Sequence, residues 1–465
     1  MKMFSSLKNA RRHHGYHDVS ATTAAFLLGR LRHFITACAA LALLSYLAPV
    51  TSKGGELGFG ESGQITTPIG PGNAQAESVA VQRDGKIVVV GSFYTSKISE
   101  FALARYNIDG SFDKRFGGSG KVTTAMGKEC AANAVAIQSD GKIALAGYVN
   151  DAGKSNFALM RYNPDGTLDN SFNSTGKVST PVGTGDERAQ AVVIQSDGKI
   201  IAAGKAAHAD SNSGFALVRY NSDGRLDTSF AGTGKVITEF GIGDYATSLA
   251  LQSDGRIVAA GDSYNKEHNY EIALVRYNVD GTLDTTFNTT GKVTTSIHGH
   301  SAANGVAVQS DGKIVVAGSC SSPDGSEIIA VARYNSDGTL DTTFNGTGMA
   351  TSALGKESRA NSVVLQTDGK IVVAGLSAAG SKTSFALARY NADGTLDPTF
   401  NGTGKVVTAM GDKRGSGYGG SGLALQTDGK IVVVGYCFTG SKNFAVARYD
   451  QNGKLDAKGG RPEKK

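Results

Sequence analysis

The sequence predicts an all-β protein, a seven-bladed β-propeller with about four antiparallel strands in each blade. The tripeptide Asp-Gly-Lys (once Asp-Gly-Arg) occurs seven times, from Asp84 to Asp428, at steps of 56 to 60 residues. The tripeptide Arg-Tyr-Asn or Arg-Tyr-Asp keeps the same spacing from Arg105 to Arg448. Such a period indicates one supersecondary unit copied seven times, here over residues 57–457.

Each unit of about 57 residues contains four apolar runs that predict strands. In the unit that begins at Lys121, the second and third runs are separated by Ser139-Asp140-Gly141, a strong hairpin pattern. The fourth run is followed by a second Asp-Gly turn. Four short strands in each unit are typical of a propeller blade. The predicted strands of this unit are Lys121–Thr124, Ala134–Gln138, Lys142–Gly147 and Phe157–Tyr162.

Several predicted strands are apolar at successive positions, as in Ile87–Val90 and Phe385–Ala388. A strand with one face in water would alternate, so these strands need cover on both faces, which stacked blades provide. The chain ends favour a closed ring. Phe59–Thr67 resembles the Phe-x-x-x-Gly-Lys-Val-Thr-Thr segment found between units, whereas the last unit stops at Lys454–Asp456 without one. We therefore expect the N-terminal strand to join the last blade and remove two open edges.

Five of the six units of net positive charge come from the N-terminal residues. Residues 1–52 hold six basic residues and one acidic residue, which leaves 41 basic and 40 acidic residues in the rest of the chain. A near-neutral body lacks the positive field that nucleic-acid binding requires. Basic residues precede the uncharged segment Phe34–Ala48, which is typical of a secretory signal peptide. The alternatives are a retained membrane anchor and a misassigned start codon. Residues 458–465 form a short basic tail.

The repeated unit Ser-Asp-Gly-Lys-Ile-Val-Val-Ala-Gly, followed by Phe-Ala-Leu-Ala-Arg-Tyr-Asn-x-Asp-Gly-Thr-Leu-Asp-x-x-Phe, resembles the delta-60 repeat family. The resemblance covers residues 57–457 and implies bacterial β-propeller repeats of exported proteins. It implies no activity, because the function of that family is unknown. One departure is Asp450–Gly453, where the other units read Asn-x-Asp-Gly.

A recurring Arg lies in a predicted buried strand of every unit, and an Asp follows it eight residues later. A buried guanidinium must be paired, so we expect one structural Arg–Asp contact inside each blade. The alternative is a ring of catalytic or ligand-binding acids. The pairs are Arg105–Asp113, Arg161–Asp169, Arg219–Asp227, Arg276–Asp284, Arg333–Asp341, Arg389–Asp397 and Arg448–Asp456.

The units differ most in two sets of connections that an up-and-down blade places on the same face of the ring. Function on a rigid scaffold usually lies on variable loops, so this face and the mouth of the central channel are the predicted ligand site. We expect the candidate residues to lie in those loops. They are Asp186, Glu187, Asp244, Tyr245, His298, His300, Glu357 and Asp412.

No cofactor or metal is predicted. The Asn-x-Asp-Gly turns resemble calcium loops, but an Arg occupies the first ligand position, so turn formation is the favoured interpretation and Ca²⁺ binding the alternative. The three cysteines after residue 52 form no disulfide framework. We expect a monomeric, exported, non-enzymatic scaffold for a protein or glycan ligand, located in the periplasm, at the cell surface or in the medium. The alternatives are a hydrolase or lyase at the central channel and a structural envelope protein. Membrane contact is expected only through an uncleaved leader.

Overall fold

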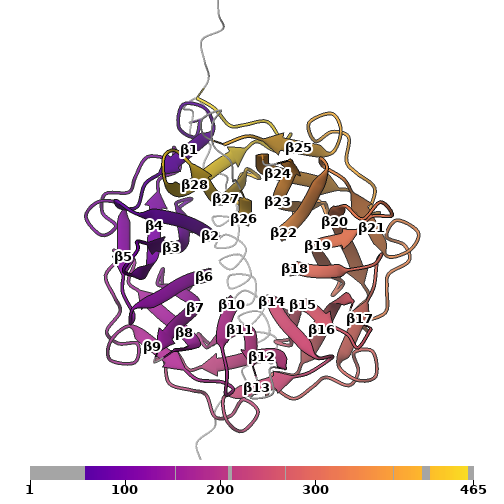
Figure 1. Cartoon of the computed structure of the whole chain (residues 1–465), viewed down its shortest axis with the longest axis horizontal. Coiled ribbons are helices and arrows are strands. Elements are labelled where there is room, and N and C mark those ends of the chain that lie inside the picture. Colours follow the sequence, from indigo (N-terminus) through magenta and orange to yellow (C-terminus); the bar gives the residue numbers. More distant parts are fainter. Residues whose placement is uncertain are drawn as a thin grey trace, which may run out of the picture. The chain divides into compact units, whose positions relative to one another are not determined.

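The computed structural model describes residues 58–151, 153–207, 212–267, 269–380, 382–410 and 419–458, all within the unit Leu57–Lys465. The leader and the residues after Lys458 lie outside the described residues. Seven four-stranded antiparallel sheets form a ring (Figure 1). This confirms the predicted seven-bladed all-β propeller. Among the described residues, no helix is long and apolar enough to span a membrane.

We number the blades in chain order, and each list of strands runs from the channel outward. Blade 1 contains β2 (Asn73–Val81), β3 (Ile87–Tyr94), β4 (Ser99–Tyr106) and β5 (Lys121–Thr124). Blade 2 contains β6 (Glu129–Ile137), β7 (Ile143–Asp151), β8 (Lys154–Tyr162) and β9 (Lys177–Thr180). Blade 3 contains β10 (Glu187–Ile194), β11 (Ile200–Ala207), β12 (Ser213–Tyr220) and β13 (Lys235–Thr238). Blade 4 contains β14 (Gly243–Leu251), β15 (Ile257–Tyr264), β16 (Tyr270–Tyr277) and β17 (Lys292–Thr295).

Blade 5 contains β18 (Ser301–Val308), β19 (Ile314–Ser321), β20 (Glu327–Tyr334) and β21 (Met349–Ser352). Blade 6 contains β22 (Glu357–Leu365), β23 (Ile371–Ala379), β24 (Lys382–Tyr390) and β25 (Lys405–Thr408). Blade 7 contains β26 (Gly419–Leu425), β27 (Ile431–Phe438), β28 (Lys442–Tyr449) and β1 (Gln64–Thr67). The inner strands are therefore β2, β6, β10, β14, β18, β22 and β26.

The N-terminal strand β1 completes blade 7, as the chain ends predict. It pairs antiparallel with β28, with Gln64 opposite Ala447 and Thr67 opposite Phe444. Figure 1 shows the indigo β1 beside the yellow β28. The strand Lys121–Thr124, assigned above as the first of its unit, is correspondingly the outermost strand of the preceding blade.

The hydrophobic core is divided among the seven blade interfaces. Leu159 of blade 2 and Ile200 of blade 3, for example, belong to one buried cluster, and six similar clusters fill the other interfaces. The second and third strands of each blade, such as β3 and β4, therefore bury side chains on both of their faces, which explains the continuous apolar runs. The three cysteines in the described residues, Cys130, Cys320 and Cys437, are buried and form no disulfide bond with one another.

The Asp-Gly turns and the Asn-x-Asp-Gly turns lie at the same ends of the blades, which we call the constant face. In the turn after β10, Gly198 has φ of 83° and Asp197 Oδ1 accepts a hydrogen bond from the Lys199 N–H at 3.1 Å. Such a tight turn usually requires a residue with a left-handed backbone conformation directly after the Asp. The opposite ends, which carry the connections that differ between blades, form the variable face.

Candidate functional site at the channel mouth

Every inner strand contains a β-bulge at the same place in the repeat, seven residues before the Asp of Asp-Gly-Lys. In blade 3 the pairing with β11 shifts between Ala189 and Ala191. Opposite this bulge stands Gly204, where a Cβ would lie 1.9 Å from the Arg188 carbonyl oxygen, so only glycine fits. The seven bulged residues are Glu77, Asn133, Gln190, Thr247, Asn304, Asn361 and Ser421.

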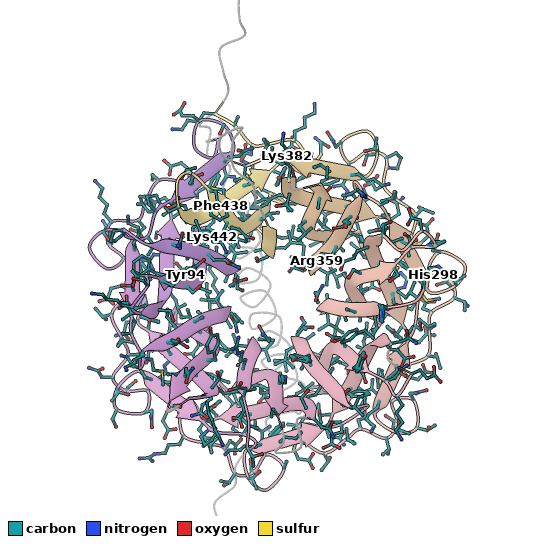
Figure 2. All side chains as sticks on the ribbon, in the orientation of Figure 1. Tyr94, His298, Arg359, Lys382, Phe438 and Lys442 are labelled. Atoms are coloured by element: carbon teal, nitrogen blue, oxygen red, sulfur yellow. The ribbon has the colours of Figure 1, made fainter. Side chains whose placement is uncertain are left out.

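All seven bulged residues line one cavity of about 570 Å³ at the variable-face mouth of the channel. Gln75, Arg359, Leu376 and Tyr436 are among its other lining residues. Figure 2 places the labelled Arg359 at the inner edge of the ring. We call the seven bulged residues the mouth ring. Its amides, hydroxyls and single carboxyl offer hydrogen bonds rather than apolar surface.

Part of the mouth ring also connects the blades. Asn133 Nδ2 donates to the Ala189 carbonyl of blade 3 at 2.8 Å, and Asn304 Nδ2 donates to Ala360 of blade 6 at 2.8 Å. By contrast, Gln190 and Arg359 form no side-chain hydrogen bond or ion pair with any described residue. These two groups are therefore available to a ligand without loss of a contact between blades.

Glu77 is the only carboxyl group among the described residues that line this cavity. Gln75 Nε2 donates to Glu77 Oε1 at 2.6 Å. Burial raises the pKa of Glu77 to about 7, and hydrogen bonds from Gln75 and Ser421, together with the positive charge of Lys442, offset only part of this effect. The Glu77 carboxyl therefore exchanges its proton near neutral pH.

This raised pKa predicts a pH-dependent stability that Glu77→Gln removes. The unfolded chain ionises Glu77 near pH 4.5, whereas the folded chain does so only near pH 7. A raised acid pKa stabilises the fold fully below pH 4.5, and this contribution is lost as the pH rises through 7. From about pH 4 to about pH 8, the free energy of unfolding of Glu77→Gln should therefore rise relative to that of the parent. The expected rise is on the order of 2 kcal/mol once the partial exposure of Glu77 is allowed for. Denaturant unfolding at both pH values measures this, and parallel changes in parent and variant would contradict it.

The seven predicted Arg–Asp pairs lie on the constant face, away from the mouth. In each pair, Arg Nε lies 2.6–3.0 Å from Asp Oδ2. Burial alone would raise the pKa of Asp341, but hydrogen bonds from Thr343 and Lys313 and the charge of Arg333 hold it at about 2. The pairs are thus buried ion pairs that involve no residue of the mouth ring.

Each of these arginines also contacts the next blade, which the sequence did not predict. Arg161 Nη1 donates to the Ser222 carbonyl of blade 3 at 2.5 Å, and its guanidinium carbon lies 4.5 Å from the centroid of the Phe172 ring. We call the Arg, its Asp, the Phe ring and the carbonyl of the next blade the Arg clasp. In blade 7 the ring comes from the N-terminal Phe59, whose centroid lies 4.8 Å from the guanidinium carbon of Arg448.

Four of the predicted loop residues lie in strands instead. Glu187, Asp244, Tyr245 and Glu357 belong to β10, β14 and β22, because inner-strand pairing continues toward the variable face. Glu187 and Asp244 are also buried. Glu187 accepts hydrogen bonds from the Val182 and Gly183 N–H groups, and Asp244 accepts from Phe240 N at 2.6 Å. Each of these two carboxylates stabilises the connection that precedes its own strand, and neither points toward a ligand site.

The other candidates do not converge on one point. Asp186 Oδ1 accepts from Ser155 N at 3.1 Å, and His300 Nδ1 accepts from Tyr270 N at 3.2 Å, so both connect neighbouring blades. Lys205 Nζ donates to the Tyr245 hydroxyl at 2.6 Å. His298, in the connection between β17 and β18, and Glu357, in blade 6, are exposed, and Figure 2 shows His298 near the rim of the ring. Asp412 lies outside the described residues.

The described residues contain no group of three or more His, Cys, Asp or Glu side chains placed to hold a metal ion. In the Asn-x-Asp-Gly turn of blade 4, Asp280 Oδ1 accepts hydrogen bonds from Thr282 N at 2.9 Å and Thr282 Oγ1 at 2.7 Å. The carboxylate therefore has the partners that turn formation requires.

The chain belongs to the β-propeller family described as "Domain of unknown function (DUF5122) beta-propeller". The family model matches more than half of the chain, in seven segments, one from each repeat. The matched residues are 82–116, 138–172, 195–230, 252–287, 309–344, 366–400 and 426–457. No curated protein matches the sequence.

Similar solved structures include an ulvan lyase of polysaccharide lyase family PL25, with 11% identity and a TM-score of 0.48, covering 86% of this chain and 96% of that one. The virginiamycin B lyase from Staphylococcus aureus has 10% identity and a TM-score of 0.43, covering 83% and 99%. Chaetomium thermophilum Sqt1 has 13% identity and a TM-score of 0.43, covering 84% and 98%. The activities named for these proteins are their own.

Proposed function

We propose that this propeller is a binding protein whose ligand is a glycan received at the mouth ring. The supporting observation is that one position of an otherwise uniform repeat carries seven polar side chains of five residue types, and all of them line one cavity. Protein-binding hot spots are rich in aromatic anchors, whereas amides and hydroxyls suit a ligand rich in hydroxyl groups. The delta-60 resemblance agrees with such a scaffold but names no ligand.

A glycan array with the purified chain tests this proposal, and Arg359→Ala and Gln190→Ala are the informative variants. Both side chains line the cavity, so each change should weaken binding of a retained glycan at least tenfold, or by about 1.4 kcal/mol. Arg83→Ala is the matched control, because Arg83 is also exposed but lines a cavity formed by constant-face turns. If the array retains nothing, or if Arg83→Ala weakens binding as much, the glycan proposal fails.

Glu77 favours a second candidate function, an enzyme that cleaves a glycan at the same mouth. A carboxyl with pKa about 7 can both donate and accept a proton near neutral pH. Incubating the retained glycan with the parent and with Glu77→Gln separates the two functions by the appearance of new chain ends. Cleavage by the parent that Glu77→Gln abolishes would establish an enzyme, and intact glycan in both samples would leave binding alone.

We also propose that the chain acts outside the cytoplasm as a monomer, with residues 1–52 as its export signal. Its ligand is neither a nucleic acid nor a lipid surface in this proposal. Fractionation of cells that produce the full chain, followed by N-terminal sequencing, tests the location and the removal of the leader.

A further inference from the structure

Each inner strand carries a second variable position, two residues before its member of the mouth ring. The residue at this position lies directly opposite a residue of the second strand, as Arg359 lies opposite Leu376 and Gly419 opposite Tyr436. Charge and size differ from blade to blade, so the mouth of the channel is not equivalent around the ring. We call these residues the entrance positions, and they are Gln75, Ala131, Arg188, Tyr245, Ala302, Arg359 and Gly419.

Two entrance positions hold arginine, and the surroundings of the two side chains differ. In blade 3, the guanidinium carbon of Arg188 lies 4.4 Å from the centroid of the Tyr148 ring of blade 2, so this charge is held against a neighbouring blade. In blade 6, the exposed Arg359 lines the mouth cavity. Among the described residues that line this cavity, Arg359 is the only one with a positive charge. Its guanidinium can therefore pair with an anionic group of a ligand.

Blade 7 provides space beside this guanidinium, because its entrance position is Gly419. A Cβ at this position would lie 3.5 Å from Tyr436 Cε1, which is an ordinary contact, so packing does not require a glycine here. The strand of Arg359 is attached to the inner strand of blade 7, since Asn361 Nδ2 donates to the Gly420 carbonyl at 2.6 Å. Arg359, Gly419 and Tyr436 all line the mouth cavity. The space left by the glycine is therefore part of the same cavity as the guanidinium.

A second positive charge contacts the wall of the cavity in blade 7. Lys442 Nζ lies 4.6 Å from the centroid of the Tyr436 ring and donates to Gln75 Oε1 at 3.3 Å, and both of these partners line the cavity. Figure 2 shows Arg359 and Lys442 in the neighbouring blades 6 and 7. The carboxyl of Glu77 is partly protonated near neutral pH, because burial raises its pKa to about 7. This part of the mouth therefore holds two positive charges and at most one negative charge.

We propose that the glycan bound at the mouth ring contains a negatively charged sugar residue, whose carboxylate or sulfate group pairs with Arg359 beside Gly419. A planar guanidinium can donate two parallel hydrogen bonds to such an oxyanion, which gives both affinity and orientation. Lys442 adds a longer-range attraction. This inference rests on the glycan binding proposed above and adds to it the charge of the ligand and the residue that recognises this charge.

An array that carries acidic and neutral oligosaccharides side by side tests the preference for charge. The acidic set holds oligogalacturonate, oligomannuronate and carrageenan oligosaccharides, and the neutral set holds oligosaccharides of galactan, mannan and cellulose. The purified full chain should bind at least one member of the acidic set. Binding of carrageenan without the two uronates would identify sulfate as the anionic group. Binding of the neutral set alone would overturn this inference and leave the proposed glycan binding intact, whereas binding of neither set would overturn both.

Calorimetric titration measures the contribution of the charge and assigns it to a residue. Methyl esterification of a uronate, or desulfation of carrageenan, should weaken binding to the full chain about tenfold. Arg359→Gln should bind the charged and the neutral form with equal affinity, because the guanidinium is the group that distinguishes them. Arg188→Gln is the matched control, since it removes the same charge from the other arginine at an entrance position, and it should keep the difference. A difference that persists in Arg359→Gln, or that falls equally in both variants, would refute the assignment.

Gly419→Leu tests the position of the charged sugar independently of its charge. The leucine side chain would fill the space beside Tyr436, so it should weaken binding of the charged and the neutral form alike, each by about tenfold. Ala302→Leu adds a similar side chain at the entrance position of blade 5, which does not line this cavity, and should leave both affinities unchanged. Denaturant unfolding of both variants verifies that they fold. Full affinity for both forms in Gly419→Leu would exclude blade 7 as the place where the sugar binds.

Discussion

Arg276→Ala is expected to lower the free energy of unfolding by about 3–5 kcal/mol. The change leaves the Asp284 carboxylate, which is only 3% exposed, without the guanidinium that lies 2.7 Å from it. It also removes the 2.5 Å hydrogen bond to the Ser336 carbonyl of blade 5 and the contact with the Phe287 ring at 4.6 Å. Denaturant unfolding followed by circular dichroism measures the loss.

Arg225→Ala is the control for this change, because it removes the same charge from an exposed position. Its side chain is 82% exposed and lies 3.7 Å from Asp223, so the expected loss is below about 1 kcal/mol. Arg276→Lys should recover only part of the stability, since one ammonium cannot reproduce the forked contacts of a guanidinium. Equal unfolding midpoints for Arg276→Ala and Arg225→Ala would contradict a stabilising role for the Arg clasp.

Ile65→Pro is expected to open the ring where β1 meets β28. Arg448 N donates to the Gly63 carbonyl at 2.9 Å, and antiparallel pairs alternate, so the Ile65 N–H points toward β28 and the Thr66 N–H points away. Proline at position 65 removes that donor and disturbs the docking of Phe59 on Arg448. We expect a loss on the order of 3 kcal/mol, combining the ladder bond with the weakened clasp of blade 7. Hydrogen exchange of the β26–β28 amides should accelerate in the variant.

Two matched variants separate backbone from side-chain effects at this closure. Thr66→Pro introduces proline one residue later, where no ladder donor is lost, so it should be clearly less destabilising than Ile65→Pro. Ile65→Ala measures the loss of the side chain alone. If Thr66→Pro and Ile65→Pro unfold at the same denaturant concentration, pairing of β1 does not hold the ring closed.

The architecture was predictable because its determinants are local and repeated. Asp-Gly turns fix the hairpin register, and Lys121–Thr124 was predicted with the bounds of β5. The strand ends near the variable face were not predictable in the same way. The strand expected to begin at Ala134 begins at Glu129, because backbone pairing set by the turn continues through residues that have no apolar pattern.

The site residues were harder to predict because their roles depend on backbone geometry. Asp244 and Glu187 were selected as carboxylates on the correct face, but each accepts hydrogen bonds from main-chain N–H groups of the preceding connection. The mouth ring was missed because a bulge is a property of strand pairing and not of residue type. The clue in the sequence was the glycine that ends each third apolar run, such as Gly204, paired with a polar position whose residue type varies among the repeats.

The contribution of Phe59 and β1 to blade 7 has a consequence for the order of assembly. Strand β1 docks on β28, which is the last strand to be synthesised, so six blades can form while β1 still lacks its partner. Until translation has passed β28, the edge of β1 can pair with a neighbouring nascent chain. A circular permutant cut between two other blades would keep every contact of the mature ring. It would change only which blade is completed last during synthesis.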